Sequence, residues 1–246
     1  MICTKKLLHM GNTVINSYNN YAAVTSFLSD IENVRFWLYE NYVSIFYLEP
    51  YKTYLFDELK PMVFCCPWLN AKVLTKTNIK TGCDDSILNF IVNSINQDMY
   101  VELTVNRYFI PIANEYKTRH YDHSLFIYGY DLNDKLIYAY DNIRHGKFIL
   151  FESTFDDIKN AYAVVDNPYI LLLTKKSNVN YVFNVAKMKQ NINNYIYSAP
   201  TPKESYYNND TNIYGVDAVK YFISSMGNNL PYLDIRFFIY IGSIIN

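Results

Sequence analysis

The sequence lacks an excess of charge and a long apolar run, and each absence excludes a class of protein. Its 22 basic and 23 acidic residues leave a net charge of −1, so no long-range field draws nucleic acid or an anionic membrane to it. No stretch approaches the ~20 apolar residues that span a bilayer, and the opening residues MICTKKLLHMGN hold no apolar run long enough for a signal peptide. We therefore expect a cytoplasmic protein with no nucleic-acid partner and no membrane partner.

Cysteine is also scarce, and the four thiols lack the spacing of metal ligands. Cys3 and Cys83 stand alone, whereas Cys65 and Cys66 are adjacent in an apolar run and are expected in the core. In a reducing cytosol such residues are ordinary thiols. No metal site is expected.

What the sequence does contain is ample apolar material in an α+β order. Half of the 246 residues are hydrophobic, enough for the core of one generous domain with a small helical appendage. Apolar spacing predicts helices over residues 17–28, with Asn16 or Ser17 as N-cap, and over 34–47 and 84–96. After residue 96 the apolar period changes to two, which predicts strands over 100–105, 124–130, 136–140, 147–151 and 169–173.

Turns and caps separate these predicted elements. Asn133-Asp134 and His145-Gly146 are hairpin turns by composition. The stretch from Ser153 to Asp156 resembles a capping box that opens a helix over residues 154–164. Two further helices are expected over 185–197 and 215–226. Helices, then an antiparallel sheet, then helices indicate the α+β class.

Two polar residues stand at matching ends of neighbouring predicted strands. His123 begins one strand, and Asp141 follows the next one across a hairpin turn. Antiparallel neighbours can bring these side chains together, and a carboxylate at one imidazole nitrogen directs the other nitrogen at a nucleophile. A surface histidine and a turn aspartate fit the same pattern. The pair alone leaves both interpretations open.

The residues around this pair resemble a known family. His-Ser-Leu-Phe-Ile-Tyr-Gly-Tyr at 123–130 and Asp-Asn-x-x-x-Gly at 141–146 are similar to the His-strand and Asp-turn of papain-like bacteriocin leader peptidases, although Asn142 stands where those proteins have Pro. They are more similar still to the carrier-protein-dependent acyltransferases of that fold, such as butirosin biosynthesis protein H and the amide-forming, cysteine-protease-like enzyme of closthioamide biosynthesis. The resemblance covers about residues 10–175.

The resemblance implies a papain-like cysteine peptidase fold, with a catalytic domain over residues 1–175 and a helical C-terminal appendage over 176–246 packed on it. It also implies a nucleophile at the N-terminus of the first core helix, where the helix dipole and a nearby histidine favour a thiolate. The matching residue is Ser17 rather than a cysteine. Three explanations stay open: an engineered Cys-to-Ser substitution, a natural serine or inactive homologue, or a different nucleophile such as Cys83.

By resemblance, the chain is an acyltransferase of specialised-metabolite (antibiotic) biosynthesis. The resemblance implies that Ser17, His123 and Asp141 would form the catalytic triad, and Asn12 and His120 are candidates for the oxyanion hole and substrate binding. An acyl group would pass from a phosphopantetheinyl acyl or peptidyl carrier protein to residue 17 and then to a small-molecule amine, forming an amide without a cofactor. Asp141→Asn is expected to preserve folding and to lower transfer. The alternatives are a peptidase or thioesterase of this fold and a catalytically silent metabolite-binding homologue.

Overall fold

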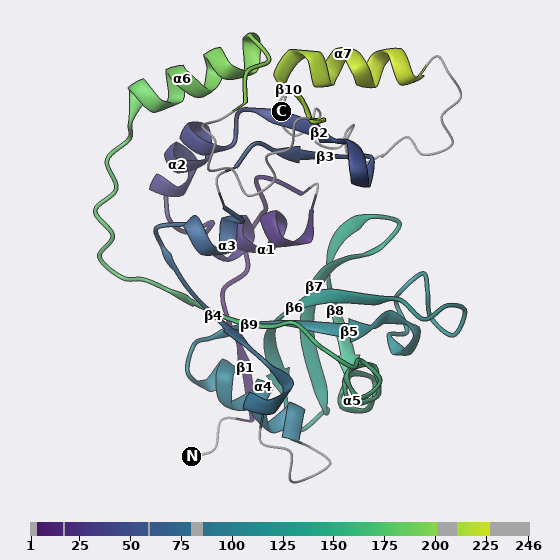
Figure 1. Ribbon diagram of the computed structural model, residues 1–246. Helices are drawn as coiled ribbons and strands as arrows, with labels where there is room; N and C mark the ends of the chain where they lie inside the picture. Colours follow the sequence, from purple (N-terminus) through teal and green to yellow (C-terminus); the bar gives the residue numbers. More distant parts are fainter. Residues whose placement is uncertain (1–3, 17, 59, 80–85, 201–210, 227–246) are drawn as a thin grey trace. The chain divides into compact units, whose positions relative to one another are not determined.

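A computed structural model of the protein describes residues 4–16, 18–58, 60–79, 86–200 and 211–226. These residues form a mixed α/β structure with seven α-helices and two sheets whose neighbouring strands run antiparallel (Figure 1). This agrees with the α+β class expected from the sequence. The chain divides into two compact units: residues 1–29 with 68–177, and residues 30–67 with 178–246. No helix in the described ranges is long and apolar enough to cross a membrane.

A seven-stranded sheet forms the centre of the first unit. Its strands follow the order β4-β9-β5-β6-β7-β8, and β1 pairs with β6 beside this path. The bounds are β1 Lys5–Leu7, β4 Leu69–Leu74, β5 Tyr100–Asn106, β6 Asp122–Asp131, β7 Leu136–Arg144, β8 Lys147–Thr154 and β9 Ile170–Lys175. The five strands predicted from the period of two correspond to β5 through β9. Strands β1 and β4 were not predicted from the sequence.

Tight turns join β6 to β7 and β7 to β8, as predicted from their residues. His145 and Gly146 have φ values of 52° and 67°, which a two-residue hairpin turn of this hand requires. These turns set the register beside each hairpin. Register shifts between Ile127 and Gly129 and between Asp141 and Arg144 then help to place His123 and Asp141.

Gly129 allows β1 to approach β6. A Cβ at this position would lie 2.7 Å from the carbonyl oxygen of Lys6 and 2.5 Å from a methyl group of Leu7. The pairing of β6 with β7 also shifts its register between Ile127 and Gly129. A residue without a side chain is therefore needed where β1 joins the sheet.

Three helices pack with this sheet: α1 Asn19–Phe27, α4 Ser86–Asn96 and α5 Phe155–Ala163. Two 3₁₀ turns, η2 Lys76–Asn78 and η3 Arg107–Phe109, complete the unit. A core of fully buried side chains joins α4 and α5 to the strands, including Ile91, Ile95, Leu103, Leu125 and Ile158. The predicted apolar face of α1 is buried as well, with Tyr21, Val24, Phe27 and Leu28 each at most 3% exposed.

Both predicted helix caps differ from the observed ones. Thr154 caps α5, since its side chain accepts from the N–H of Asp157 while the Asp157 carboxylate accepts from the N–H of Thr154. The capping box therefore lies one residue later than the stretch from Ser153 to Asp156. In α1 the N-cap is Tyr18, without a side-chain cap. Neither Asn16 nor Ser17 takes that position, and Ser17 itself lies outside the described residues.

The second unit combines a small sheet with four helices. Its sheet has the order β10-β2-β3, formed by β2 Ile45–Leu48, β3 Thr53–Phe56 and β10 Ile213–Tyr214. The helices are α2 Asn33–Asn41, α3 Met62–Cys65, α6 Val185–Ile196 and α7 Gly215–Met226, with a 3₁₀ turn η1 at Glu49–Tyr51. The predicted helix over 34–47 was wrong after Asn41. Its last part is β2, whose four residues are all buried and are of types that favour strands.

A buried carboxylate connects α2 to the C-terminal part of this unit. Glu40 is 6% exposed, and it accepts hydrogen bonds from the hydroxyl of Tyr181 and from the N–H of Asn184.

The end of the predicted catalytic domain, residue 175, lies close to the change of unit at 177/178, whereas residues 30–67 belong to the second unit. Cys66 is buried as expected, but Cys65 is exposed.

Candidate active site

The candidate site lies in the first unit, where β5 ends and β6 begins. Strand pairing sets Val105 opposite His123 and Asn106 opposite Asp122. The side chain of His123 is 24% exposed, so its ring is only partly open to solvent. A histidine at the start of a strand is thus held by a regular ladder while part of its side chain stays accessible.

Asp141 lies on the next strand, β7, and is almost fully buried. Its side chain is 1% exposed, and its Oδ2 lies 3.6 Å from Nδ1 of His123. The sequence predicted a hydrogen bond between the two, but this distance is at ion-pair range and beyond a normal hydrogen bond. The other carboxylate oxygen accepts from the backbone N–H of Asn142 at 2.7 Å. The two residues are neighbours without being directly bonded.

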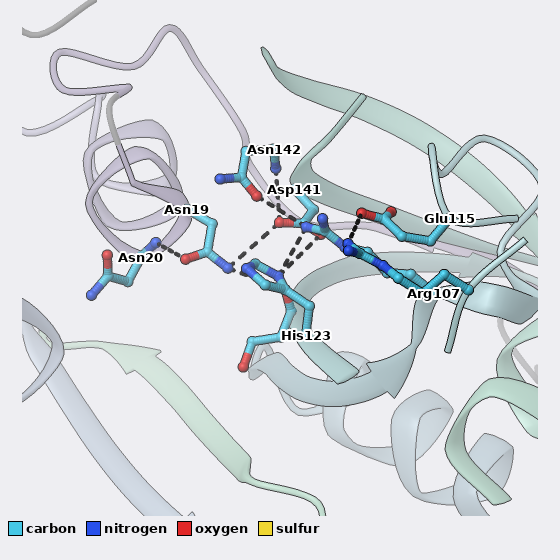
Figure 2. A network of polar contacts seen from close by, with 9 residues as sticks. Asn19, Asn20, Arg107, Glu115, His123, Asp141 and Asn142 are labelled. Atoms are coloured by element: carbon cyan, nitrogen blue, oxygen red, sulfur yellow. Dashed lines mark hydrogen bonds and ion pairs between the residues drawn. The ribbon is translucent and has the colours of Figure 1, made fainter. Parts of the chain in front are cut away.

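Arg107 occupies the space between them (Figure 2). Its Nη2 lies 2.6 Å from Oδ2 of Asp141, 2.9 Å from Nδ1 of His123 and 3.0 Å from Oδ1 of Asn142. The arginine side chain is 7% exposed and the aspartate 1%. The main partner of the Asp141 carboxylate is therefore a buried guanidinium, which is an arrangement the sequence did not predict.

These contacts allow two tautomers of His123, and only one of them makes the ring a base at its outer nitrogen. Nδ1 also lies 2.8 Å from the carbonyl oxygen of Ser124. A hydrogen on Nδ1 is donated to that carbonyl and leaves Nε2 with a free lone pair. If Nδ1 instead accepts from Arg107, which has donors only, the hydrogen is on Nε2. The choice between these partners decides whether Nε2 accepts a proton.

The N-terminal end of α1 meets the same group of residues. Nδ2 of Asn19 donates to the carbonyl oxygen of Ser124 at 3.1 Å and lies 3.5 Å from Oδ1 of Asp141. Oδ1 of Asn19 accepts from the N–H of Asn20 at 2.9 Å (Figure 2). An amide at the first residue of a buried helix thus contacts both strands of the His123–Asp141 pair. Ser17 precedes this residue by two positions and lies outside the described residues.

The two residues proposed for the oxyanion hole and substrate binding lie apart from these contacts. Asn12 is exposed in the segment between β1 and α1. His120 stacks on Tyr108, with ring centroids 4.3 Å apart, and its Nδ1 lies 3.3 Å from Oδ1 of Asn106. The partners of His120 are therefore the last residue of β5 and the 3₁₀ turn η3 that follows it. Cys83, the alternative nucleophile, lies outside the described residues.

Sequence reasoning missed Arg107 and Asn19. Arg107 follows β5 in a 3₁₀ turn, Arg-Tyr-Phe, which has no apolar period to attract notice. Its position could nevertheless have been predicted. If the strands predicted over 100–105 and 124–130 pair antiparallel, the residues that follow the first strand lie next to the residues that precede the second strand. Asn19 was visible only as a residue of the predicted helix. Its long-range contacts span 105 and 122 residues of sequence, which no local pattern encodes.

The sequence matches no protein-family model, and it has no significant match among curated proteins.

Proposed function

We propose that the first unit is a papain-like acyltransferase in which residue 17, His123 and Asp141 form the catalytic group. The observation that supports this best is the contact of Asn19 with Ser124 and Asp141, at 3.1 and 3.5 Å. It brings the start of a buried helix to a histidine on one strand and a carboxylate on the next. A nucleophile just before that helix would stand beside a base, as acyl transfer requires.

The proposed reaction has two steps, in the tautomer that leaves Nε2 of His123 free. The residue 17 side chain attacks the carbonyl of a carrier-protein thioester while Nε2 takes its proton, the C–S bond breaks, and the carrier thiol leaves with that proton. An amine then attacks the acyl-enzyme. The C–N bond forms, the bond to residue 17 breaks, and the amine proton returns to residue 17 through His123. If water replaces the amine, the same steps describe a peptidase or thioesterase.

Ser17→Cys provides the test, because a thiol ionises far more readily than a serine hydroxyl. The variant is incubated with a short acyl N-acetylcysteamine thioester and followed by intact-protein mass spectrometry. We expect one added acyl mass, discharged as an amide by a primary diamine, and little labelling of the parent chain. His123→Ala in the Ser17→Cys background should lose most labelling, whereas His120→Ala should have the smaller effect.

Ser29→Cys is the matched control. Ser29 also stands beside a histidine, since its Oγ lies 3.0 Å from Nε2 of His9. Its recorded hydrogen bonds are with His9 and Ser26 and not with His123 or Asp141. A thiol there reports on unspecific acylation. Equal labelling of the two variants would contradict the proposal, and labelling that depends on Cys83 would move the nucleophile to that residue.

A second candidate is a silent homologue that binds a metabolite without turnover. The contact of Arg107 with Nδ1 of His123 at 2.9 Å favours it, because the tautomer that accepts from Arg107 has no lone pair on Nε2. In that case neither Ser17→Cys nor the parent is acylated. Binding of the same thioester, measured by calorimetry, would be unchanged by His123→Ala.

A further inference from the structure

The guanidinium nitrogen Nη2 of Arg107 has more neighbours than it has hydrogens. It lies 2.6 Å from Oδ2 of Asp141, 3.0 Å from Oδ1 of Asn142 and 2.9 Å from Nδ1 of His123 (Figure 2). A terminal guanidinium nitrogen carries two N–H bonds. Two of the three neighbours can therefore accept a full hydrogen bond from Nη2, and the third cannot.

Two oxygens compete with the imidazole for these hydrogens. The carboxylate of Asp141 is at the shortest distance and has the opposite charge, so it accepts the first. The amide of Asn142 also presents its oxygen, because a guanidinium has donors only and the NH₂ group of the amide would oppose it. Asn142 can satisfy this contact only by accepting, whereas the imidazole of His123 can either accept or donate.

An irregularity of β7 brings two consecutive side chains to the same nitrogen. Successive residues of a regular strand point to opposite faces of the sheet, yet Asp141 and Asn142 both reach Nη2 of Arg107. The pairing of β7 with β8 shifts its register between Asp141 and Arg144, and such a shift changes the direction of a side chain. The second oxygen at Nη2 is therefore a consequence of the local shape of the strand.

His123 has another partner for Nδ1, the carbonyl oxygen of Ser124 at 2.8 Å. If Nδ1 carries the hydrogen, it donates to Ser124, and the two hydrogens of Nη2 go to Asp141 and Asn142. If Nδ1 carries none, it accepts one hydrogen of Nη2, so that Asn142 and Ser124 each lose a donor. The first arrangement contains one hydrogen bond more than the second.

We propose that Asn142 is a positioning residue that keeps the ring hydrogen of His123 on Nδ1, because it accepts the second hydrogen of Arg107. Nε2 then keeps its lone pair and can accept a proton. One hydrogen bond of ordinary net strength corresponds to a ratio of about fivefold between the tautomers, and we expect at least this excess of the Nδ1–H form. The tautomer belongs to the folded chain, and only its use as a base in acyl transfer rests on the proposed function.

Nitrogen-15 NMR tests the assignment, because the shifts of the two ring nitrogens report which of them carries the hydrogen. The full chain is labelled at its four histidines, and the His123 signals are identified by their loss in His123→Gln. The pH is raised until the shifts stop changing, so that the neutral ring is observed. We expect the Nδ1–H form in the parent. In Asn142→Ala the second hydrogen of Nη2 is donated to Nδ1, so the ratio should fall by about fivefold or more.

Three further variants separate this role from a structural one. Asn142→Asp retains an acceptor at Nη2 and should keep the parent tautomer. Asn133→Ala, at an exposed turn position, should leave the tautomer unchanged. Arg107→Met in the Asn142→Ala background removes the competing donor and should restore the Nδ1–H form.

The parent spectrum is decisive even if no variant folds, since the Nε2–H form in the parent would overturn the assignment. An Asn142→Ala ratio equal to that of the parent would overturn it as well. These spectra require no acylation. Failure of Ser17→Cys to be labelled would therefore contradict the proposed function alone.

Discussion

Replacement of Asp141 by Asn tests how strongly the buried ion pair holds the candidate site together. The Arg107 and Asp141 side chains are 7% and 1% exposed, with their atoms 2.6 Å apart. From the sequence, with His123 as the only partner, we expected this substitution to preserve folding. The structure changes that expectation, because Arg107 would be left with a buried charge and no carboxylate.

The magnitude follows from this loss of the counter-charge. Breaking a buried pair by removing one partner costs about 3–5 kcal/mol of the free energy of unfolding. The Asn oxygen can still accept from Arg107, so we expect a loss near the lower end, about 3 kcal/mol. Arg107→Met should cost a similar amount. The double variant should lose less than the sum of the two, by about 1–3 kcal/mol, because neither charge is left alone.

Chemical unfolding followed by tryptophan fluorescence measures these values. The sequence has two tryptophans: Trp68 belongs to the first unit and Trp37 to the second. A Trp37→Phe background leaves Trp68, which is 3% exposed, as the reporter of the first unit. Asp134→Asn, at an exposed turn position, is the control and should stay within about 0.5 kcal/mol of the parent. If Asp141→Asn costs no more than this control, the ion pair does not stabilise the unit.

Three further predictions concern other parts of the first unit. Because the pKa of Glu102 is raised from 4.5 to about 7 by burial, the folded chain keeps a proton that the unfolded chain has lost, and the free energy of unfolding falls as pH rises through this range. In urea unfolding, Glu102→Gln should therefore gain about 3 kcal/mol relative to the parent between pH 4.5 and 8. A difference between variant and parent that does not change with pH would refute this. Thr154→Ala should cost about 1 kcal/mol in the same assay and Ser153→Ala less, with the reverse order showing that the cap is misassigned. In Gly146→Ala the added methyl group meets no atom within 4 Å, so the substitution should cost only the strain of its positive φ, about 1–2 kcal/mol. Gly129→Ala should cost more and remove hydrogen-exchange protection from β1. Equal losses of stability in the two variants would contradict the close approach of β1 to Gly129.

The sheet could be predicted from the sequence because its signals are local. Residue types that favour strands and turn residues between neighbouring strands sufficed for β5 to β9, although β5 is buried at six of its seven positions and does not alternate. The residues Ile45–Leu48 are not separated from the preceding helix by such turn residues. They continue an apolar run out of a helix, and an apolar run of four residues fits a helix and a strand equally well until its partner strands are known. Tertiary pairing with β3 and β10 decided the outcome.

The candidate site was predictable only to the level of neighbouring strands. The hairpin between β6 and β7 sufficed to bring His123 near Asp141. It did not predict that Arg107 forms an ion pair with the carboxylate of Asp141. A donor in a 3₁₀ turn is identified only once the pairing of β5 with β6 is known. The same limit applies to Glu102, whose significance comes from its burial in an interior strand rather than from its sequence neighbours.

The discontinuous course of the first unit affects when its site can form during synthesis. Asn19 and Asp141 are 122 residues apart, and residues 30–67, which belong to the other unit, are made between them. At about 5–20 residues per second, the first helix waits roughly 6–25 s for the strands it contacts. Its buried face includes Val24 and Phe27. Tyr100 of β5, which stacks on Phe27, is made partway through that interval, whereas β7, which also contacts α1, is absent until its end. A nascent chain stalled before β7 should therefore expose this face to chaperones, whereas one that has passed β8 should bury it.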